Sequence, residues 1–306
     1  MSIFESHDGL KIRYDTYACR ENTCRGTIVL LGGRSEFIEK YKEIVDQLLA
    51  RNLDVATLDW RGQGLSDRML PNRHKGYVGS YDDYLQDLTY FMDRYVPQQE
   101  GKPVMILAHS MGGHIALRYL HDNPGRVGKA VLTSPLIDIA GPTLLTQTMK
   151  MVVHIAAKSG FKKHYATRAN DFDSSKKRFA GNRLTRDPYR FQKTIQMIAN
   201  NPDVAIGGVT FGWLNATFNS IRYMMGDGYL ESIATPLLIV SAGADEIVSV
   251  AAQKKACRRI PDCDLIMIPN ALHELLIETD AVLEKFWETF DAFMFHPPSA
   301  KQKDLS

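Results

Sequence analysis

A serine between an apolar run and a helix-forming run is the residue of this chain best placed to do chemistry. Residues 104–108 are apolar, Ser110 follows two positions later, and helix-forming residues begin at once. This is the strand, sharp turn and helix context of the G-x-S-x-G pattern, in which the turn presents a serine as a nucleophile. The pattern requires small residues two positions before and after the serine, and Ala108 and Gly112 stand there. We therefore predict that Ser110 is a nucleophile, the simpler alternative being a serine that only caps a helix.

The base that Ser110 would need is best supplied by His273. A serine hydroxyl is a weak nucleophile at neutral pH and reacts when a histidine accepts its proton. Nine histidines are present, and His273 follows an expected strand at residues 264–268 through a short loop. His109 and His114 lie beside Ser110 in sequence, but we expect the turn and the helix to direct them elsewhere.

The acid that would orient this histidine is expected at Asp245. The apolar strand expected at residues 236–240 runs out into a turn of small residues that carries the Asp245 carboxylate. The resulting chain order of serine, acid and histidine is that of the strand–turn–helix serine enzymes. Asp138, which follows an expected strand at residues 129–133, is the alternative acid, and we expect Glu246 to face solvent.

Two backbone N–H groups are expected to stabilise the oxyanion that forms when a serine attacks a carbonyl carbon. Such donors must be fixed in advance to lower the barrier. The N–H of Met111, directly after Ser110, is the first expected donor. The second is expected from the loop at residues 32–36, where Gly32 and Gly33 let the backbone approach closely. Without the serine turn, these glycines would fit a plain turn equally well.

The elements that must hold these side chains alternate between strand-like and helix-like patterns. Apolar β-type runs and stretches of 3.6-residue periodicity follow one another along most of the chain. This alternation predicts an α/β fold with a mostly parallel central sheet and helices on both faces. We expect strands at residues 10–17, 26–31, 55–58, 104–107, 129–133, 236–240 and 264–268, and helices at residues 36–51, 80–95, 111–122, 250–260 and 281–295.

Residues 137–230 interrupt the alternation. They show no convincing strand pattern but contain helical stretches, among them residues 144–157 and 189–198. The segment carries 13 lysines and arginines against 6 acids, a net charge of +7 in a chain whose net charge is +2. We predict a cap over the carboxyl ends of the strands, where α/β enzymes place their sites. The predicted divisions are a core of residues 1–136 and 231–296, a helical cap of residues 137–230, and a disordered tail of residues 297–306.

Composition and charge exclude several classes of protein. A chain of 306 residues that is 44% hydrophobic and 24% charged fits one large globular domain, and no apolar run is long enough for a membrane span. The first residues lack the basic start and apolar core of a signal peptide, so we expect a cytoplasmic protein. The four cysteines match no zinc pattern, and we expect free thiols, with Cys19 and Cys24 able to pair under oxidation. We expect no nucleic-acid partner, because the basic residues lack interleaved aromatic residues.

With these residues in place, the chain resembles the α/β-hydrolase superfamily, in particular its lysophospholipase and monoacylglycerol lipase branch. Residues 32–41 are similar to the oxyanion loop of that branch at Gly33, Glu36 and Tyr41. This match implies that Arg34 contributes the second oxyanion N–H through its backbone. Residues 59–66 and 211–216 are also similar to segments of the branch, the first of which supports the site without doing chemistry.

Two residues depart from the pattern of that branch. Gly32 stands where the branch has a histidine, and Ala108 stands at the first glycine of the serine turn. The change at Gly32 keeps the N–H donors but leaves open how the loop is braced. The chain resembles the bacterial lysophospholipases more than the animal monoacylglycerol lipases.

The resemblance implies a serine hydrolase, without cofactor or metal, whose triad is Ser110, Asp245 and His273. Its expected substrates are lysophospholipids or monoacylglycerols, cleaved through an acyl-enzyme. Apolar residues also recur at helical spacing among the lysines of the expected cap, namely Leu145, Met149, Val152, Val153 and Ala156. Such a stripe could contact acyl chains or lie peripherally on an anionic membrane surface. Packing of the stripe against the sheet domain is the alternative.

Other functions of the same fold are weaker alternatives. An aminopeptidase should carry acidic cap residues that hold the free amine of its substrate, whereas this segment is basic. A hydrolase of small esters stays open. Epoxide and haloalkane hydrolases are disfavoured because their nucleophile is an aspartate, where this chain has Ser110. A ligand-binding member without activity would be expected to lose the serine, the acid or the histidine, and all three are present.

Overall fold

An eight-stranded sheet forms the centre of the molecule in a computed structural model that describes residues 2–19 and 23–295. The strand order is β1-β2-β4-β3-β5-β6-β7-β8, with β1 and β2 antiparallel to their neighbours and the other pairs parallel. The predicted α/β fold with a mostly parallel sheet is confirmed. The strands are β1 (Ser2–Glu5), β2 (Lys11–Tyr17), β3 (Thr27–Leu31), β4 (Asp54–Leu58), β5 (Val104–His109), β6 (Ala130–Thr133), β7 (Leu237–Ala242) and β8 (Cys263–Ile268).

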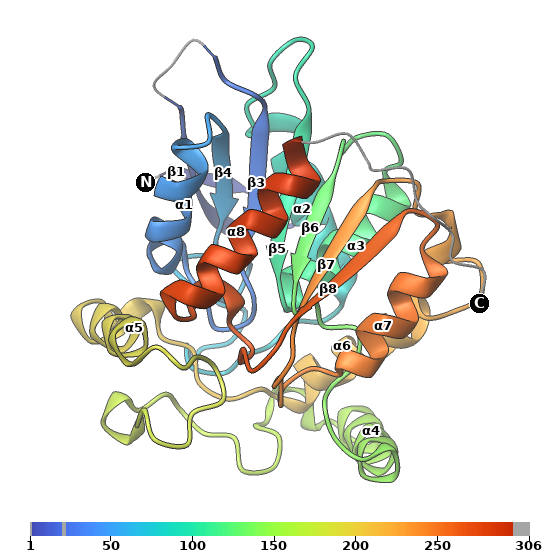
Figure 1. Cartoon of the computed structure of the whole chain (residues 1–306). Coiled ribbons are helices and arrows are strands. Elements are labelled where there is room, and N and C mark those ends of the chain that lie inside the picture. Colours follow the sequence, from blue (N-terminus) through green and yellow to red (C-terminus); the bar gives the residue numbers. More distant parts are fainter. Residues whose placement is uncertain (1, 20–22, 296–306) are drawn as a thin grey trace.

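Helices cover both faces of the sheet, which is why the central strands β3 and β4 are buried throughout. Every residue of β3 and β4 is buried, as expected for parallel strands that are covered on both sides. One face packs against α1 (Lys42–Leu49) and α8 (Asp280–Phe295), which lie in front of the sheet in Figure 1. The other face packs against α2 (Tyr81–Arg94), α3 (Met111–Asp122) and α7 (Val250–Arg259).

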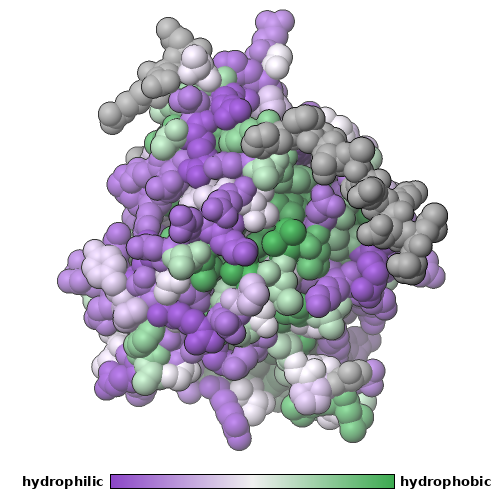
Figure 2. Space-filling view, viewed as in Figure 1, coloured by the Kyte–Doolittle hydropathy of each residue, from purple (hydrophilic) through white to green (hydrophobic). Residues whose placement is uncertain are grey.

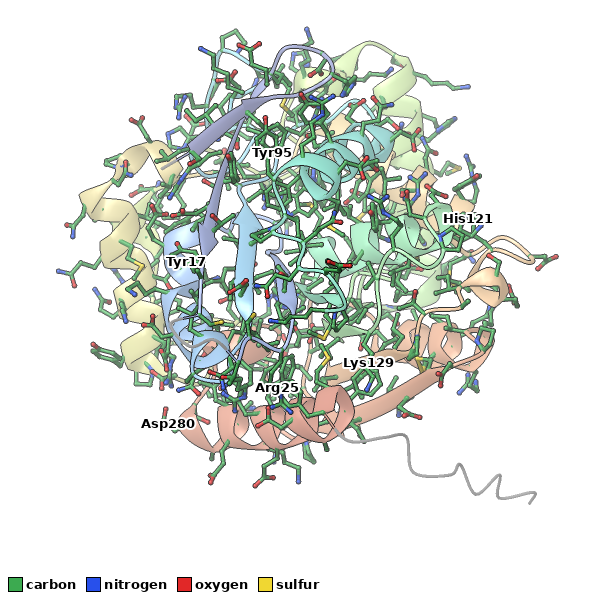
Figure 3. The ribbon with its side chains drawn as sticks, turned by 90° about the horizontal axis from the view of Figure 1, so that it is seen from above. Tyr17, Arg25, Tyr95, His121, Lys129 and Asp280 are labelled. Carbon is green, nitrogen blue, oxygen red and sulfur yellow. A yellow bond between two sulfur atoms is a disulfide. The ribbon has the colours of Figure 1, made fainter. Side chains whose placement is uncertain are left out.

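The long helix α8 is held at both of its ends by charged groups. Asp280, in its first turn, pairs with Arg190 at 2.7 Å. At the other end, Lys129 Nζ donates to the carbonyl of Phe293 at 2.7 Å, and the guanidinium of Arg25 lies over the Phe295 ring. Figure 3 shows Asp280 at one end of this helix and Lys129 and Arg25 near the other. The acid at the amino end and the cations at the carboxyl end match the helix dipole.

Three α-helices lie in the segment of residues 137–230, with short 3-10 turns between them. They are α4 (Thr143–Lys158), α5 (Pro188–Asn200) and α6 (Phe211–Met224). In Figure 1, α4 and α5 lie at the lower end of the molecule, below the carboxyl ends of the parallel strands. Within the described residues, this segment forms isolated β-bridges but no named strand. Residues 211–216, which resemble a segment of the hydrolase branch, form the start of α6, a helix that the sequence pattern did not predict.

The helix expected at residues 36–51 begins later and in a different form. A 3-10 turn spans Ile38–Tyr41 and precedes α1. The predicted start is wrong because the chain is still extended at Phe37, whose φ is −149°. The N–H of Ile38 donates to the Asp59 carboxylate at 2.9 Å, so this side chain takes the place of an earlier helical turn.

The cysteines differ in part from the prediction of free thiols. Cys257, near the end of α7, and Cys263, at the start of β8, form a disulfide. The short connection between these two elements brings their Cα atoms to 5.4 Å, within the range that a disulfide needs. Cys19 and Cys24 lie outside this disulfide and keep their thiols. The predicted tail at residues 297–306 lies outside the described residues. No helix among the described residues has the length and apolar character needed to cross a bilayer.

Candidate active site

Ser110 occupies a strained turn between β5 and α3. Its φ of 50° and ψ of −113° lie outside the regions that side chains favour. Close packing behind the turn explains the small residues around it. A Cβ on Gly112 would lie 2.5 Å from the carbonyl oxygens of Leu31 and Gly32. Ala108 is fully buried in the sheet, so its methyl group is accommodated where the pattern has glycine.

Ser110, His273 and Asp245 meet at the carboxyl edge of the sheet. His273 Nε2 lies 2.9 Å from Ser110 Oγ, and His273 Nδ1 lies 2.7 Å from Asp245 Oδ2. Ser110 is 8% exposed and His273 is 5% exposed. Because the Asp245 carboxylate accepts from Nδ1–H, Nε2 is left to accept the proton of the serine hydroxyl. The arrangement can therefore activate a serine for attack on a carbonyl carbon.

The Asp245 carboxylate is held as an anion by its neighbours. Burial raises its pKa, but the hydrogen bond and charge of His273 and two backbone donors act more strongly together and leave the pKa below its usual value. The donors are the N–H groups of Ile247 and Val248, at 2.8 and 3.0 Å from Asp245 Oδ1. One carboxylate oxygen thus fixes the acid, and the other is free to orient the histidine.

The alternative acid, Asp138, is engaged elsewhere. Its Oδ2 accepts from Lys150 Nζ at 2.9 Å, and its Oδ1 accepts from the N–H of Ile139. Neither oxygen is bonded to His273, whose Nδ1 is taken by Asp245. Asp138 therefore joins helix α4 to the end of β6 instead of orienting the histidine.

The two histidines next to the serine are buried and neutral. His109 Nδ1 lies 3.1 Å from the carbonyl oxygen of Thr133, and His114 lies between the Leu136 carbonyl and the Ser220 hydroxyl. Burial lowers the pKa of His109 to about 4 and that of His114 to about 3. The centre of the His109 ring lies 4.9 Å from that of the His273 ring, with the two planes tilted by 54°, so His109 is nearer to the site than the sequence indicated.

The loop after β3 approaches Ser110 closely enough to supply an oxyanion donor. A Cβ on Gly33 would lie 3.2 Å from Ser110 Cβ, which is tighter than an ordinary contact and favours glycine there. The N–H of Met111 is the first of helix α3 and has no intrahelical acceptor. The N–H of Arg34 has no hydrogen-bond acceptor among the described residues. Both groups are thus available, and their role as oxyanion donors stays a prediction.

The loop at residues 32–36 is braced without the histidine that Gly32 replaces. Trp60 Nε1 donates to the Gly32 carbonyl at 2.8 Å. Gln63 Nε2 donates to the Gly33 carbonyl, and Gln63 Oε1 accepts from the N–H of Ser35, both at 3.0 Å. Trp60 and Gln63 lie in the segment of residues 59–66, so this segment supports the oxyanion loop as the resemblance implied.

A buried ion network that the sequence did not reveal joins the oxyanion loop to the histidine loop. Glu36 accepts hydrogen bonds from the Gly33 N–H and the Tyr41 hydroxyl. Lys40 Nζ lies 2.8 Å from both a Glu36 oxygen and a Glu274 oxygen, and Glu274 directly follows His273 in the chain. Burial opposes the charge on Glu36, but the Lys40 cation and the hydrogen bonds outweigh it and set the pKa of Glu36 at about 2.

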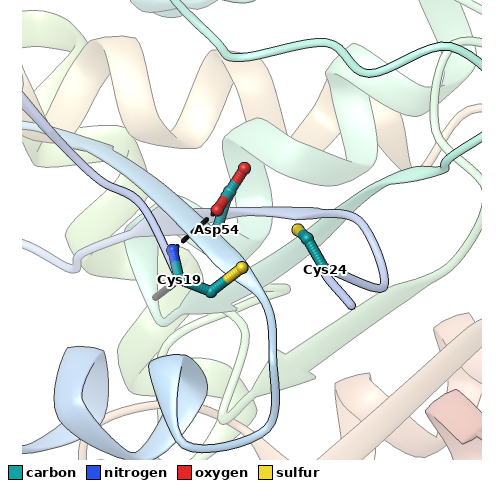
Figure 4. Close-up of side chains that lie close together, drawn as sticks. All are labelled: Cys19, Cys24 and Asp54. Atoms are coloured by element: carbon teal, nitrogen blue, oxygen red, sulfur yellow. Dashed lines mark hydrogen bonds between the residues drawn. The ribbon is translucent and has the colours of Figure 1, made fainter. Parts of the chain in front are cut away.

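A set of possible metal ligands lies at the opposite end of the sheet. Cys19, Cys24 and Asp54 have donor atoms within 4.8 Å of one another, and the N–H of Cys19 donates to Asp54 Oδ1 at 2.8 Å (Figure 4). Asp54 begins β4, whereas Ser110 follows the carboxyl end of β5. The parallel strands β4, β3 and β5 therefore separate this cluster from Ser110 by about their own length. The three groups are one fewer than a closed tetrahedral zinc site uses.

Comparisons with known proteins match most of the chain. The family model described as serine aminopeptidase, S33, matches residues 22–280. The chain is 27% identical to lysophospholipase L2 of Escherichia coli over 91% of its own length and 82% of that protein. It is 24% identical to monoacylglycerol lipase of Mycolicibacterium smegmatis over 92% of each chain.

Solved structures with the same fold cover almost the whole chain. A soluble variant of monoglyceride lipase from Saccharomyces cerevisiae superposes with a TM-score of 0.75 at 22% identity, covering 94% of this chain and 92% of that one. A thermostable carboxyl esterase from Bacillus coagulans gives a TM-score of 0.72 at 15% identity, covering 95% and 96%. At these identities the likeness establishes the fold.

Proposed function

The chain belongs to the serine aminopeptidase S33 family and is a carboxylic ester hydrolase of the α/β-hydrolase fold, and we propose that its substrates are lysophospholipids or monoacylglycerols. The observation that carries the proposed chemistry is the unbroken hydrogen-bond chain from Ser110 through His273 to Asp245. Support for the substrates comes from the relatives called lysophospholipase and monoacylglycerol lipase.

In the proposed reaction, Ser110 is the nucleophile and His273 carries the proton. The Ser110 oxygen attacks the ester carbonyl while its proton passes to His273 Nε2, and the negative charge forms on the carbonyl oxygen. The N–H groups of Met111 and Arg34 stabilise this oxyanion. The intermediate then breaks its bond to the alcohol oxygen, which takes the proton from His273. The acyl group stays on Ser110 as an ester.

Water completes the proposed cycle. His273 removes a proton from a water molecule, whose oxygen attacks the acyl carbonyl, and the proton then returns to Ser110 as the fatty acid leaves. Asp245 keeps its hydrogen bond to Nδ1 throughout and stabilises the imidazolium in both halves of the reaction. These steps use side chains and water, and they involve no cofactor or metal.

The outer face of α4 supports a lipid-like substrate. Leu144 is 77% exposed, Leu145 is 66% exposed and Ile155 is 57% exposed. Exposed apolar side chains also appear at the lower right of Figure 2, where α4 lies in Figure 1. Lysines surround this face, including the exposed Lys158. Large apolar side chains that remain in contact with water on a basic helix are typical of surfaces that meet lipid.

The apolar stripe predicted from the sequence divides between two surfaces. Val153 is buried and packs with Phe218 and Ile221 of α6, and Met149 packs partly against the same cluster. Leu145 and Val152 point into solvent at 66% and 48% exposure. Part of the stripe therefore packs inward, against α6 instead of the sheet domain, and part stays exposed. One side of α4 holds the helix in place, while the other is free to contact a partner.

We propose that this exposed face lies against anionic membranes. The double change Leu145→Ser and Ile155→Ser should lower binding to vesicles that contain phosphatidylglycerol by about tenfold, because both apolar anchors are lost. The matched control is Ile3→Ser, since Ile3 is 55% exposed on the distant strand β1. Equal binding by the double variant and the control in a vesicle sedimentation assay contradicts the proposal.

The description of the family raises peptide cleavage as a second possibility. An aminopeptidase must hold the positive amine of its substrate, yet residues 137–230 carry a net charge of +7. This charge favours an uncharged or anionic substrate instead. Hydrolysis of amino-acyl p-nitroanilides with no turnover of acyl esters would favour the peptide over the lipid.

The direct test is a substrate series with one inactive control. We expect purified protein to hydrolyse p-nitrophenyl esters, monoacylglycerols and lysophospholipids, with the rate rising from short to long acyl chains. Ser110→Ala should abolish turnover of all three. If the folded wild-type protein hydrolyses short p-nitrophenyl esters but no lipid, the proposed substrate class is wrong and a small-ester hydrolase remains. If it hydrolyses none, the catalytic proposal also fails.

A further inference from the structure

The side chain of Arg34 lies at the junction between the oxyanion loop and the helical segment. Its Nη2 donates to the carbonyl of Gly207, and its Nη1 donates to Ser35 Oγ at 2.9 Å. The guanidinium also lies 5.4 Å from the ring of Trp213 on α6. A Cβ on Gly76 would come within 2.8 Å of Nη2, so a side chain at this position would displace the guanidinium. The guanidinium thus packs against the backbone of Gly76.

Arg34 is partly buried and, unlike most of the enclosed cations in the described part of the chain, has no acid beside it. Lys40 lies between Glu36 and Glu274, and further buried cations each have a carboxylate within 4.0 Å, namely Arg13, Arg61 and Arg118. Over residues 2–19 and 23–295, no carboxylate forms an ion pair with Arg34. A charge removed from water needs such a partner to offset its lost hydration.

Two further observations show that the charge of Arg34 is uncompensated. Its Nε is buried and has no hydrogen-bond partner within the described chain; Arg13 and Arg118 also leave Nε unpaired, but their other guanidinium nitrogens contact carboxylates. Burial lowers the pKa of the guanidinium to about 10, and the nearby groups that oppose this shift are tyrosines. Buried donors in native proteins are nearly always paired, so an unpaired one in a catalytic region points to an external acceptor.

The position of Arg34 determines how far from the ester carbonyl a substrate group must lie to meet its guanidinium. The backbone N–H of Arg34 is the predicted oxyanion donor, and its neighbour Gly33 lies directly against Ser110. The guanidinium is therefore separated from the reacting carbonyl by the length of a single side chain. In a lysophospholipid, the glycerol carbons separate the acyl ester from the phosphate by a similar length. A monoacylglycerol has a neutral hydroxyl at that place.

We infer that Arg34 binds the phosphate of a lysophospholipid head group and so determines specificity for phosphate-bearing esters. The inference rests on the proposed function, which it narrows from two substrate classes to one. Binding exchanges the neutral Gly207 carbonyl for an anionic acceptor and gives Nε the partner that it lacks. Arginine is suited to this task because its planar fork can donate two hydrogen bonds to one phosphate.

The test compares two substrates that share an acyl chain and differ in the phosphate. For Arg34→Met we expect the ratio of kcat/KM for a lysophosphatidylglycerol to kcat/KM for the matching monoacylglycerol to fall at least tenfold, chiefly through KM. Arg34→Lys keeps the charge but loses the fork, so its ratio should be intermediate. Both variants keep the backbone N–H at position 34.

A matched control is available at Arg68. This arginine also lacks a carboxylate, but its guanidinium donates to the carbonyls of Ser66, Gly64, Arg73 and Asp203. Burial lowers the pKa of Arg68 to about 10, as it does for Arg34. Arg68→Met should therefore leave the substrate ratio at its wild-type value. A fall in the ratio for Arg68→Met equal to that for Arg34→Met overturns the inference, since any buried arginine would then act alike.

A second readout does not depend on turnover. Glycerol 3-phosphate should slow the labelling of Ser110 by a fluorophosphonate in the wild-type protein and should not slow it in Arg34→Met. Equal protection in both proteins, or a loss of activity by Arg34→Met that is the same for both substrates, contradicts phosphate binding and leaves a positioning role. If the wild-type protein hydrolyses neither lipid, the proposed function is refuted. If it hydrolyses them and the ratio of the two kcat/KM values is unchanged in Arg34→Met, only the inference about Arg34 is refuted.

Discussion

The edge of the sheet and the helical segment of residues 137–230 differ in which side chains they bury. The edge buries polar side chains, whereas the segment leaves apolar side chains exposed. At the edge, His273 is hydrogen-bonded on both ring nitrogens and is 5% exposed. On the outer face of α4, Leu144 and Leu145 are 77% and 66% exposed. The sheet thus fixes the groups proposed to react, while the segment leaves apolar surface uncovered. The difference separates the groups proposed to react from the apolar surface proposed to meet lipid.

The largest expected effect comes from removing the nucleophile. Ser110→Ala should reduce kcat on any acyl ester by about 10⁵-fold or more, since the remaining groups cannot form the acyl-enzyme. The thermal unfolding midpoint should change little, because alanine removes only the hydroxyl group and keeps the backbone of the turn. Steady-state hydrolysis of a p-nitrophenyl ester measures the loss. Residual activity within tenfold of the wild type would place the chemistry elsewhere.

The next effect separates the two candidate acids. Asp245→Asn should reduce kcat by about 10⁴-fold, since an amide cannot hold His273 in the required tautomer. Asp138→Asn should change kcat by no more than a few-fold, because its partner is Lys150 of α4. The two substitutions are matched in chemistry and differ in the region they affect. A large loss for Asp138→Asn with little loss for Asp245→Asn reverses the assignment.

A smaller effect is expected where the oxyanion loop meets the histidine loop. Glu274→Gln keeps an oxygen near Lys40 but removes the charge, so the geometry between Gly33 and His273 should loosen. We expect kcat to fall about 10- to 100-fold, with a smaller change in KM. Glu246→Gln, at an exposed neighbour of Asp245, is the control. Equal losses in kcat for these two variants would show that the buried network does not position the site.

The smallest effect concerns stability where the two regions meet. His114 of α3 contacts Ser220 of α6, and burial lowers its pKa to about 3. The unfolded chain binds this proton near pH 6.5, so stability is lost as the pH falls from 6.5 towards 3. His114→Gln should reduce by a few degrees the drop in Tm between pH 6.5 and 4. An unchanged drop would mean that His114 does not contribute to acid sensitivity.

Local patterns predicted the elements that place the reactive groups. The apolar run before Ser110 and the helix after it are adjacent in the chain, so periodicity alone located β5 and α3 close to their observed bounds. The same holds for β7, which precedes Asp245. Strand β1 was missed because Phe4 is its single buried residue, which leaves almost no alternation to detect.

Contacts between distant segments were beyond the reach of such patterns. The Lys40–Glu274 ion pair joins two loops that only the folded sheet brings together. The burial of Val153 and the exposure of Leu145 depend on where α6 packs, although both residues carry the same apolar signal in the sequence. The resemblance predicts a role for the backbone N–H of Arg34 alone. Only the folded structure shows that its side chain has no nearby acid among the described residues.

The most direct test of the account is the site of covalent labelling by a fluorophosphonate. Peptide mass spectrometry of the labelled protein should find one adduct, on the peptide that carries Ser110. Labelling should be lost in Ser110→Ala and slowed strongly in His273→Gln, because the hydroxyl then lacks its base. A folded wild-type protein that does not react, or an adduct on another residue, contradicts the claim that Ser110 is the activated nucleophile.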